Sequence, residues 1–252
     1  MIEYSIVIPV YNEEAVITSS LTQILTFMRT FSSSFEVILV DDESTDNSVS
    51  NIEGYMREHP EVKLMRNQHR GKGYTVRTGM LMASGQYILM ADADMAVPIE
   101  ELKRLMVWMK EHSFDLVIGS REGVGATRHN EPWIRHFMGR VFNLAIRLVA
   151  VPGIQDTQCG FKVFTKEAAH NIFKRLVLFG SDTPTVKQPR VTAFDVEVLL
   201  IARKLGYKIK EVPITWYYGA GSKVSIIGDS LVNLRDIFKV RINDLLGKYP
   251  TF

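Results

Sequence analysis

The chain has 252 residues, of which 46% are hydrophobic and 23% are charged, an ordinary composition for a globular protein with a substantial core. Its net charge of +2 is too small to indicate nucleic-acid binding. The one cysteine, Cys159, excludes an internal disulfide and any metal site built from several cysteines. The sequence contains no run of 18 apolar residues, so it predicts no membrane-spanning helix.

Strand and helix patterns alternate along the first 120 residues. Runs rich in β-branched and other apolar residues predict buried strands at 4–10, 35–40, 62–66, 87–91 and 114–119. A helical pattern follows each of the first four strands, and Pro98 marks the start of the fourth helix. This alternation predicts an α/β fold with a mostly parallel, Rossmann-like sheet and helices on both of its faces.

Two carboxylates directly follow the fourth predicted strand. The apolar run over residues 87–91 stops at Asp92, and Asp94 comes two residues later. Ligands of open α/β sheets bind at the carboxyl ends of the strands. Paired carboxylates are hard oxygen ligands, suited to Mg²⁺ or Mn²⁺ held together with substrate phosphates. The sequence therefore predicts a metal site at Asp92 and Asp94, with a solvated acidic turn as the alternative.

Polar groups that suit a nucleotide follow other strands. Tyr11 is placed to stack on a base, Asn12 and Glu13 come next in the chain, and the carboxylate of Asp42 is placed to accept hydrogen bonds from a base or ribose. Lys72 stands between two glycines at a predicted helix start, where N–H groups and an ammonium favour phosphate. The alternative for this lysine is a solvated surface position. Together these groups predict a nucleoside diphosphate bridged to the two aspartates by a divalent cation.

Three of these segments carry a family resemblance. Segments 7–14 (VIPVYNEE), 40–46 (VDDESTD) and 91–94 (ADAD) resemble the family 2 glycosyltransferases, whose fold is called GT-A, and the resemblance covers nearly the whole chain. The resemblance becomes more specific in three further segments, 151–164 (VPGIQDTQCGFKVF), 193–197 (AFDVE) and 216–223 (WYYGAGSK). They resemble the dolichyl-phosphate and polyprenyl-phosphate glucosyl- and mannosyltransferases, closer to the glucosyl branch.

The resemblance implies a function and a set of contacts. It implies transfer of a hexose from UDP-glucose or GDP-mannose to a dolichyl or polyprenyl phosphate, with inversion at the anomeric carbon. It places the nucleotide against Pro9, Tyr11, Glu13 and Asp42, and the metal on the two aspartates. Mannosyl relatives often have a Gln two residues past the second aspartate. This chain has Ala96 there, which weakens the mannosyl assignment and leaves the third protein ligand open.

The second half is locally basic and has an amphipathic segment. Residues 121–147 hold five arginines against two glutamates. Residues 133–151 predict a helix with a wide apolar face and a narrow basic stripe, typical of a helix lying in a membrane interface. The alternatives are a helix packed on the sheet with its stripe toward solvent, or the interface of a homodimer.

A second amphipathic pattern runs from about residue 226 to 246. The predicted organisation is a catalytic GT-A domain over 1–224 and a C-terminal amphipathic helix within 225–252. The domain would have a nucleotide-sugar and metal half (1–120) and an acceptor half (121–224). Because the N-terminus lacks the basic and apolar segments of a signal peptide, we expect a cytoplasmic protein bound peripherally to the cytoplasmic face of a membrane.

The acceptor decides which side chains the reaction needs. A phosphate monoester is largely dianionic at pH 7, since its second pKa is about 6, so it needs cations rather than a base. Arg121, Arg135 and Lys223 are the candidates for holding it. A sugar hydroxyl would need a carboxylate base, and Asp195 or Asp156 would supply it. The lipid-phosphate hypothesis therefore predicts that loss of the Asp195 carboxylate costs less activity than loss of the Arg135 guanidinium.

Other features have plainer interpretations. The loop at 180–190 is expected to border the acceptor path, with an inert surface loop as the alternative. Cys159 is interpreted as a small buried residue, and His69 and His129 as surface residues rather than ligands. Two other classes remain as alternatives: a nucleotide-sugar-binding protein without turnover, and a nucleotidyltransferase. The intact Asp-x-Asp and the missing basic, Gly-rich loop after the first strand argue against them.

Overall fold

The computed structural model describes residues 1–132, 151–186, 193–219 and 226–249, and for residues 226–231 it describes the backbone only. The strands in these residues are β1 (Tyr4–Val10), β2 (Phe35–Asp41), β3 (Val62–Arg66), β4 (Tyr87–Met90), β5 (Leu116–Ser120), β6 (Thr127–His129), β7 (Lys162–Thr165), β8 (Ile209–Pro213) and β9 (Thr215–Tyr217). The helices are α1 (Ile17–Phe31), α2 (Ser48–Met56), α3 (Lys72–Met82), the 3-10 turn η1 (Ile99–Glu101), α4 (Leu102–Glu111), α6 (Lys166–Phe173), α7 (Phe194–Lys204) and α8 (Ile226–Leu245).

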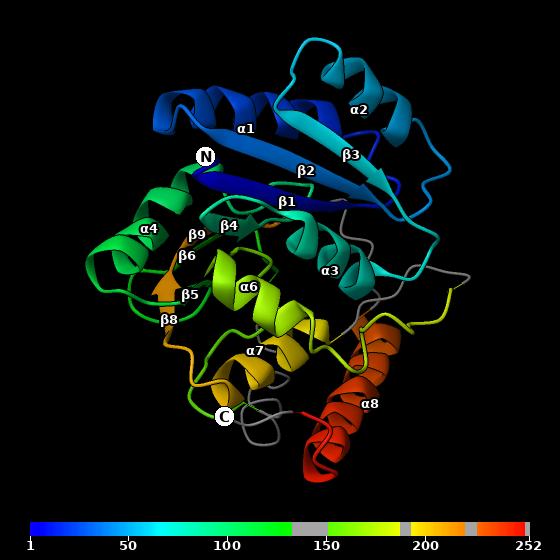
Figure 1. Ribbon diagram of the computed structural model, residues 1–252, viewed down its shortest axis with the longest axis vertical. Coiled ribbons are helices and arrows are strands. Elements are labelled where there is room, and N and C mark those ends of the chain that lie inside the picture. The colour runs from blue at the N-terminus through cyan, green and yellow to red at the C-terminus, as the bar shows by residue number, and fades with distance from the viewer. Residues whose placement is uncertain (133–150, 187–192, 220–225, 250–252) are drawn as a thin grey trace.

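One seven-stranded sheet forms the centre of the molecule (Figure 1). Its strand order is β3-β2-β1-β4-β7-β5-β8, and a separate pair, β6 and β9, lies beside it. The neighbours β3-β2-β1-β4 are parallel, as predicted. Strands β5 and β8 are also parallel, although β8 was not predicted from the sequence. Strand β7, from the second half of the chain, lies antiparallel between β4 and β5. The sheet is therefore mostly parallel, but β4 and β5 are not neighbours.

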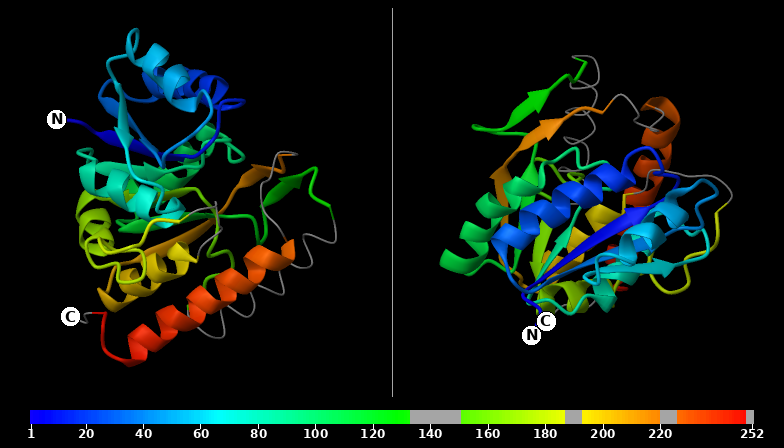
Figure 2. Two further views of the ribbon diagram at one scale, coloured as in Figure 1. Left: turned by 90° about the vertical axis from the view of Figure 1, so that its right-hand side faces the viewer. Right: turned by 90° about the horizontal axis from the view of Figure 1, so that it is seen from above.

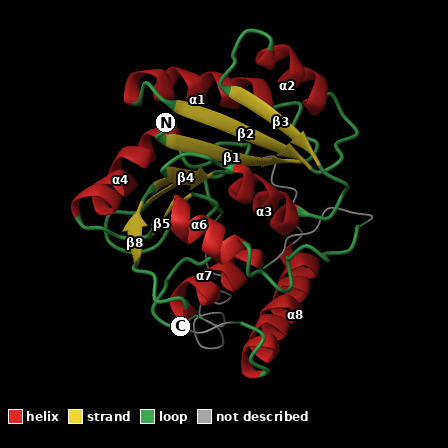
Figure 3. Ribbon diagram, viewed as in Figure 1, coloured by secondary structure: helices red, strands yellow, loops and turns green. Residues whose placement is uncertain are grey.

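Helices cover both faces of the sheet (Figure 3). Alternate residues of β1 point to opposite faces, because side chains in a strand alternate with a period of two. Val7 packs in one core with α3, α6 and α7, whereas Ile6 and Ile8 pack in another with α1 and α4. The near-continuous apolar runs found in the sequence thus correspond to strands buried on both faces.

The C-terminal helix α8 is confirmed as a helix and crosses beside α7 at the end of the molecule (Figure 2). Ile237 and Val240 are buried in the core that includes α7. Among the described residues, no helix is both long enough and apolar enough to cross a bilayer. The predicted helix at 133–151 lies almost entirely outside the described residues.

Candidate active site

The two predicted metal ligands lie in a turn just after β4. The backbone N–H of Met95 donates to the carbonyl of Asp92 at 3.2 Å, and Met95 has a φ of 48°. The side chain of Asp94 is exposed and accepts the backbone N–H of Ala96 at 3.1 Å. The carboxylate of Asp92 is half-buried against Gly160, where a Cβ atom would come within 2.1 Å of its Oδ2. Only glycine at position 160 leaves this carboxylate where it is.

Lys72 is paired with Asp92. Its Nζ lies 2.5 Å from Asp92 Oδ1, so the residue predicted to bind phosphate contacts the residue predicted to bind metal. Burial alone would raise the pKa of Asp92, but Lys72 lowers it below its usual value. Burial would likewise lower the pKa of Lys72, but Asp92 and Asp195 raise it. The pKa of Asp94 is raised by partial desolvation and by the charge of Asp92.

Asp42 fixes the loop that leads into α3. Its carboxylate accepts hydrogen bonds from His69 Nδ1 (2.7 Å) and from the backbone N–H groups of Arg70 and Gly71 (both 2.9 Å). Gly71 has a φ of 86°, a conformation that glycine adopts without strain. Asp42 therefore positions Lys72 through the backbone, and its three hydrogen bonds are internal to the protein.

The prediction that His69 is a surface residue is wrong. His69 is 7% exposed, and its ring stacks on that of Tyr11 with centroids 4.4 Å apart. The sequence does not reveal this burial, because the partner of His69, Asp42, lies 27 residues away. His129 is half-buried and stacks on Tyr217 in the β6–β9 pair.

The loop after β1 is tied to the loop after β2. The backbone N–H of Asn12 donates to Ser44 Oγ at 3.0 Å, and that of Glu13 donates to Ser48 Oγ at 2.7 Å. Asn12 Oδ1 accepts the backbone N–H of Thr45 at 2.8 Å. Pro9 lies within β1, whose carboxyl end leads into this loop. The residues predicted to bind the nucleotide therefore meet at one edge of the sheet.

Arg121, directly after β5, is already paired. Its Nε and Nη2 contact the two oxygens of Asp156 at 2.7 and 2.8 Å, and its guanidinium lies 5.4 Å from the ring centroid of Trp216. Burial would raise the pKa of Asp156, but Arg121 lowers it to about 2. Glu211 holds this turn by accepting the backbone N–H of Asp156. A fully paired carboxylate with a low pKa is a poor general base, so the structure disfavours Asp156 in that role.

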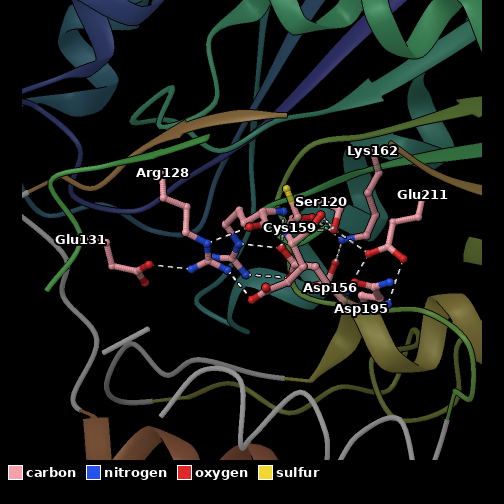
Figure 4. Close-up of polar contacts among 11 residues, drawn as sticks. Ser120, Arg128, Glu131, Asp156, Cys159, Lys162, Asp195 and Glu211 are labelled. Carbon is pink, nitrogen blue, oxygen red and sulfur yellow. Dashed lines mark hydrogen bonds and ion pairs between the residues drawn. The ribbon is translucent and has the colours of Figure 1, made fainter. Parts of the chain in front are cut away.

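Lys162 is a site residue that the sequence analysis did not single out. Its side chain is completely buried, pairs with Asp195 and donates to the carbonyl of Cys159 (Figure 4). Burial raises the pKa of Asp195, and Lys162 opposes that shift. The available signal was a lysine inside an apolar strand, since a buried lysine requires a partner.

Asp195 and Glu197 both lie on α7 and face different surroundings, because side chains two residues apart on a helix point to different sides. Glu197, on α7, accepts the backbone N–H groups of Val177, Leu178 and Phe179 and the hydroxyl of Tyr249. It fastens the segment before the 180–190 loop and has a structural role. Cys159 is buried, as predicted, and burial raises its pKa to about 12, which leaves it a thiol rather than a nucleophile.

Several predicted features lie outside the described residues. These are Arg135, Lys223 and residues 187–190 of the loop. The described part of the loop contacts the segment beside Asp42: Val186 N–H donates to the His69 carbonyl at 2.8 Å, and Arg70 donates to the Ser181 carbonyl at 3.1 Å. It therefore lies against the expected nucleotide side of the site.

The donor set fits a divalent cation. The ammonium of Lys72 on Asp92 already occupies the place that a cation would take, and Asp94 follows in the same turn. Within the described residues, no group of three or more His, Cys, Asp or Glu side chains forms a metal site. Asp92 and Asp94 would therefore hold the cation together with oxygens of a bound phosphate, as is common for Mg²⁺.

Comparisons with known proteins show the family to which the chain belongs. The family model described as "Glycosyl transferase family 2" matches residues 5–173. Dolichyl-phosphate beta-glucosyltransferase of Dictyostelium discoideum is 33% identical over 256 residues, covering 96% of this chain and 75% of the relative. The human protein of that name is 30% identical over 263 residues, covering 98% and 77%.

Solved structures show the same fold. A mannosyltransferase from Pyrobaculum calidifontis in complex with GDP-Man and Mn²⁺ aligns with a TM-score of 0.61 at 20% identity, covering 96% of this chain and 64% of that one. Glucosyl-3-phosphoglycerate synthase from Mycobacterium tuberculosis in complex with UDP aligns with a TM-score of 0.62 at 18% identity, covering 94% and 79%. With its GT-A fold and a family match over most of its length, the chain belongs to glycosyltransferase family 2.

Proposed function

We propose that this glycosyltransferase moves glucose from UDP-glucose to a dolichyl or polyprenyl phosphate. The observation that carries the proposal is the meeting of Lys72, Asp92 and Asp94 beside the Tyr11–His69 stack, at the carboxyl edge of the sheet. That edge is where open α/β sheets bind their ligands. The names of the relatives, which are dolichyl-phosphate beta-glucosyltransferases, support glucose and the lipid phosphate.

The chain's own residues would act mainly on the diphosphate. Asp92 and Asp94 would hold Mg²⁺ or Mn²⁺, which supplies positive charge to the departing nucleoside diphosphate. Lys72, at the start of α3, is placed to stabilise the negative charge that develops on the departing diphosphate, because its ammonium already lies beside Asp92. Pro9, Tyr11, Asn12, Glu13 and Asp42 would form the nucleotide side of the site.

The acceptor phosphate would be the nucleophile without help from a base. Its dianion is abundant at pH 7. Arg121, Arg135 and Lys223 would supply the positive field that attracts it. Asp195 is buried and paired with Lys162, so in this proposal its role is to position that lysine and the Cys159 carbonyl.

Helix α8 would place the site at the surface of a membrane. Phe238, Ile242, Leu245 and the adjacent Leu246 are 54%, 53%, 73% and 66% exposed and recur at helical spacing. The exposed Lys239 stands next to this apolar stripe. Apolar side chains with neighbouring lysines suit the interface of an anionic bilayer, where the lipid acceptor resides. On this basis the enzyme binds peripherally to the cytoplasmic face.

A donor and acceptor panel tests the function. Purified protein is incubated with Mn²⁺, a polyprenyl phosphate in detergent, and radiolabelled UDP-glucose or GDP-mannose, and hexose is followed into the lipid phase. We expect label from UDP-glucose in the lipid phase and none after chelation of the metal. If hexose is transferred from GDP-mannose and not from UDP-glucose, the proposed donor is wrong. Donor hydrolysis with no lipid product would favour a saccharide hydroxyl as the acceptor, and donor binding without any turnover would favour a binding protein.

A further inference from the structure

The first turn of α3, which carries Lys72, packs directly against a segment from the second half of the chain. Gly73 follows Lys72, and a Cβ atom at position 73 would lie 2.9 Å from the ring of Phe179 and 2.8 Å from the Cβ of Phe194. Both distances are shorter than real Cβ contacts. The backbone of α3 therefore rests on the buried ring of Phe179, and the place of this turn depends on the place of that ring.

Phe179 is held by a buried carboxylate. It lies in the turns between α6 and α7, outside the helices and strands. Glu197, which is completely buried, accepts the consecutive backbone N–H groups of Val177, Leu178 and Phe179 at 2.8, 2.7 and 3.1 Å. Hydrogen bonds to an ionised group are strong, and burial strengthens them further. Three of them on successive residues fix the path of the backbone and with it the origin of the Phe179 ring.

The backbone around Lys72 is thus held from two sides. Before it, the N–H of Gly71 donates to Asp42 at 2.9 Å. After it, Gly73 rests on Phe179. The chain that continues from Phe179 also contacts the residues just before Lys72, through hydrogen bonds with both His69 and Arg70. The place of the Lys72 backbone decides what its ammonium reaches, and a misplacement of about 1 Å in a site is costly.

We propose that Phe179 is a positioning residue for the donor site: it sets the place of Lys72 by supporting Gly73, and Glu197 holds it there. The inference rests on the proposed function, because it assumes that the Lys72 ammonium binds the diphosphate of the donor. It extends the donor site to side chains that pack behind α3. An ordinary core residue would support the whole fold, whereas Phe179 is expected to act on nucleotide binding through Lys72.

A double-mutant cycle in nucleotide binding separates these two roles. UDP affinity is measured by calorimetry at saturating Mn²⁺ for the unaltered protein, Phe179→Leu, Lys72→Met and the double variant. We expect Lys72→Met to weaken UDP binding about tenfold or more, the effect of one lost charge-assisted hydrogen bond. Phe179→Leu should weaken it about fivefold in the unaltered protein and by less than about twofold in Lys72→Met, because its effect passes through the missing ammonium. Losses that simply add would overturn the proposal.

Phe173→Leu is the control for the loss of a buried ring. Phe173 is completely buried in the same core, where its ring packs edge-on against that of Phe164. The substitution removes the same atoms as Phe179→Leu, so it should lower the melting temperature to a similar extent. It should leave UDP affinity unchanged. Equal losses of UDP affinity in Phe173→Leu and Phe179→Leu would mean that Phe179 acts only through general stability.

Glu197→Gln tests the same support without altering the ring, and it decides the question if Phe179→Leu does not fold. The amide brings an NH₂ group among three backbone donors, so part of the hold on residues 177–179 is lost. UDP binding should weaken in the unaltered protein and not in Lys72→Met. Equal weakening in both backgrounds would contradict a role through Lys72.

The cycle also keeps the inference apart from the function on which it rests. If Lys72→Met binds UDP as tightly as the unaltered protein, the ammonium does not bind the diphosphate, and the inference fails together with that part of the proposed function. If Lys72→Met weakens binding but the losses add, the inference fails alone. These measurements need no acceptor, so failure of lipid transfer would refute the proposed acceptor separately.

Discussion

The contact between Lys72 and Asp92 joins two predicted roles in one ion pair. Sequence spacing placed a phosphate-binding lysine and a metal-binding aspartate at the same edge of the sheet, but not in contact. Their 2.5 Å separation means that a divalent cation on Asp92 Oδ1 must displace the ammonium. A displaced Lys72 would then be available to the diphosphate. Metal and nucleotide binding are therefore expected to be coupled.

Replacing Lys72 should strengthen metal binding in the absence of nucleotide. Lys72→Met removes the competing ammonium and leaves two carboxylates without a counter-charge, so Mn²⁺ affinity should rise about tenfold. Free Mn²⁺ is measured by electron paramagnetic resonance during titration. Lys63→Met is the control, because Lys63 pairs with Glu36 at the other end of the sheet. Weaker Mn²⁺ binding in Lys72→Met would contradict displacement.

Asp94 should be needed for transfer and not for folding. Asp94→Ala is expected to abolish hexose transfer, a loss of about a thousandfold or more, because the metal loses one of its two carboxylates. Its side chain is exposed, so the melting temperature should stay within a few degrees. Glu100→Ala, an exposed carboxylate on η1, is the control. Turnover near that of the unaltered enzyme would refute the metal assignment.

Lys162 should contribute to stability through charge pairing. Lys162→Met leaves the buried Asp195 carboxylate without its partner, and removing one member of a buried pair typically costs about 3–5 kcal/mol. Urea unfolding should show this loss in the free energy of unfolding. Lys166→Met, an exposed lysine four residues later on α6, should change it by less than about 0.5 kcal/mol. Equal stability of the two variants would mean that the pair is not formed in solution.

At the scale of elements, Glu36 fastens the start of β2 to its neighbours. Its carboxylate accepts hydrogen bonds from Ser5 on β1, from Ser84 before β4 and from Lys63 on β3. Burial alone would raise the pKa of Glu36, but these hydrogen bonds, that from Lys63 first, lower it from 4.5 to about 2. One side chain therefore joins four neighbouring segments at the amino end of the sheet.

This shift predicts a pH dependence of stability. The folded pKa lies below the unfolded one, so the contribution is complete above pH 4.5 and is lost as the pH falls toward about 2. Between pH 6 and pH 3 the urea midpoint should fall more in the unaltered protein than in Glu36→Gln, because the amide does not titrate. Glu58→Gln, an exposed residue, should behave like the unaltered protein. An identical pH response of Glu36→Gln and Glu58→Gln would count against the contribution of Glu36.

The exposed stripe of α8 should mediate membrane binding. The double variant Phe238→Asp and Ile242→Asp places two carboxylates in the stripe without touching the buried Ile237 or Val240. Co-sedimentation with anionic vesicles should fall by tenfold or more, because charge is costly in the interface and is repelled by anionic lipid. Val107→Asp, a substitution of an exposed apolar residue on α4, should still bind. Undiminished binding of the double variant would exclude α8 as the contact.

At the scale of the whole molecule, the site is completed by residues far apart in the chain. Strand β7 enters the sheet between β4 and β5 and brings Lys162 to Asp195. The turn before it brings Gly160 against Asp92 and Asp156 against Arg121. Segments from residues 1–120 and from the later part of the chain therefore share one sheet.

Local patterns in the sequence determined the strands and helices of the first 120 residues, helix α8 and the carboxyl-end position of Tyr11, Asp42, Asp92 and Asp94. Strand periodicity and side-chain chemistry are short-range properties, so a single sequence displays them. The pairing of Lys72 with Asp92, of Lys162 with Asp195 and of His69 with Asp42 was decided only by the tertiary structure. Each pair joins residues 20 or more positions apart, and its energy depends on burial that no local pattern encodes.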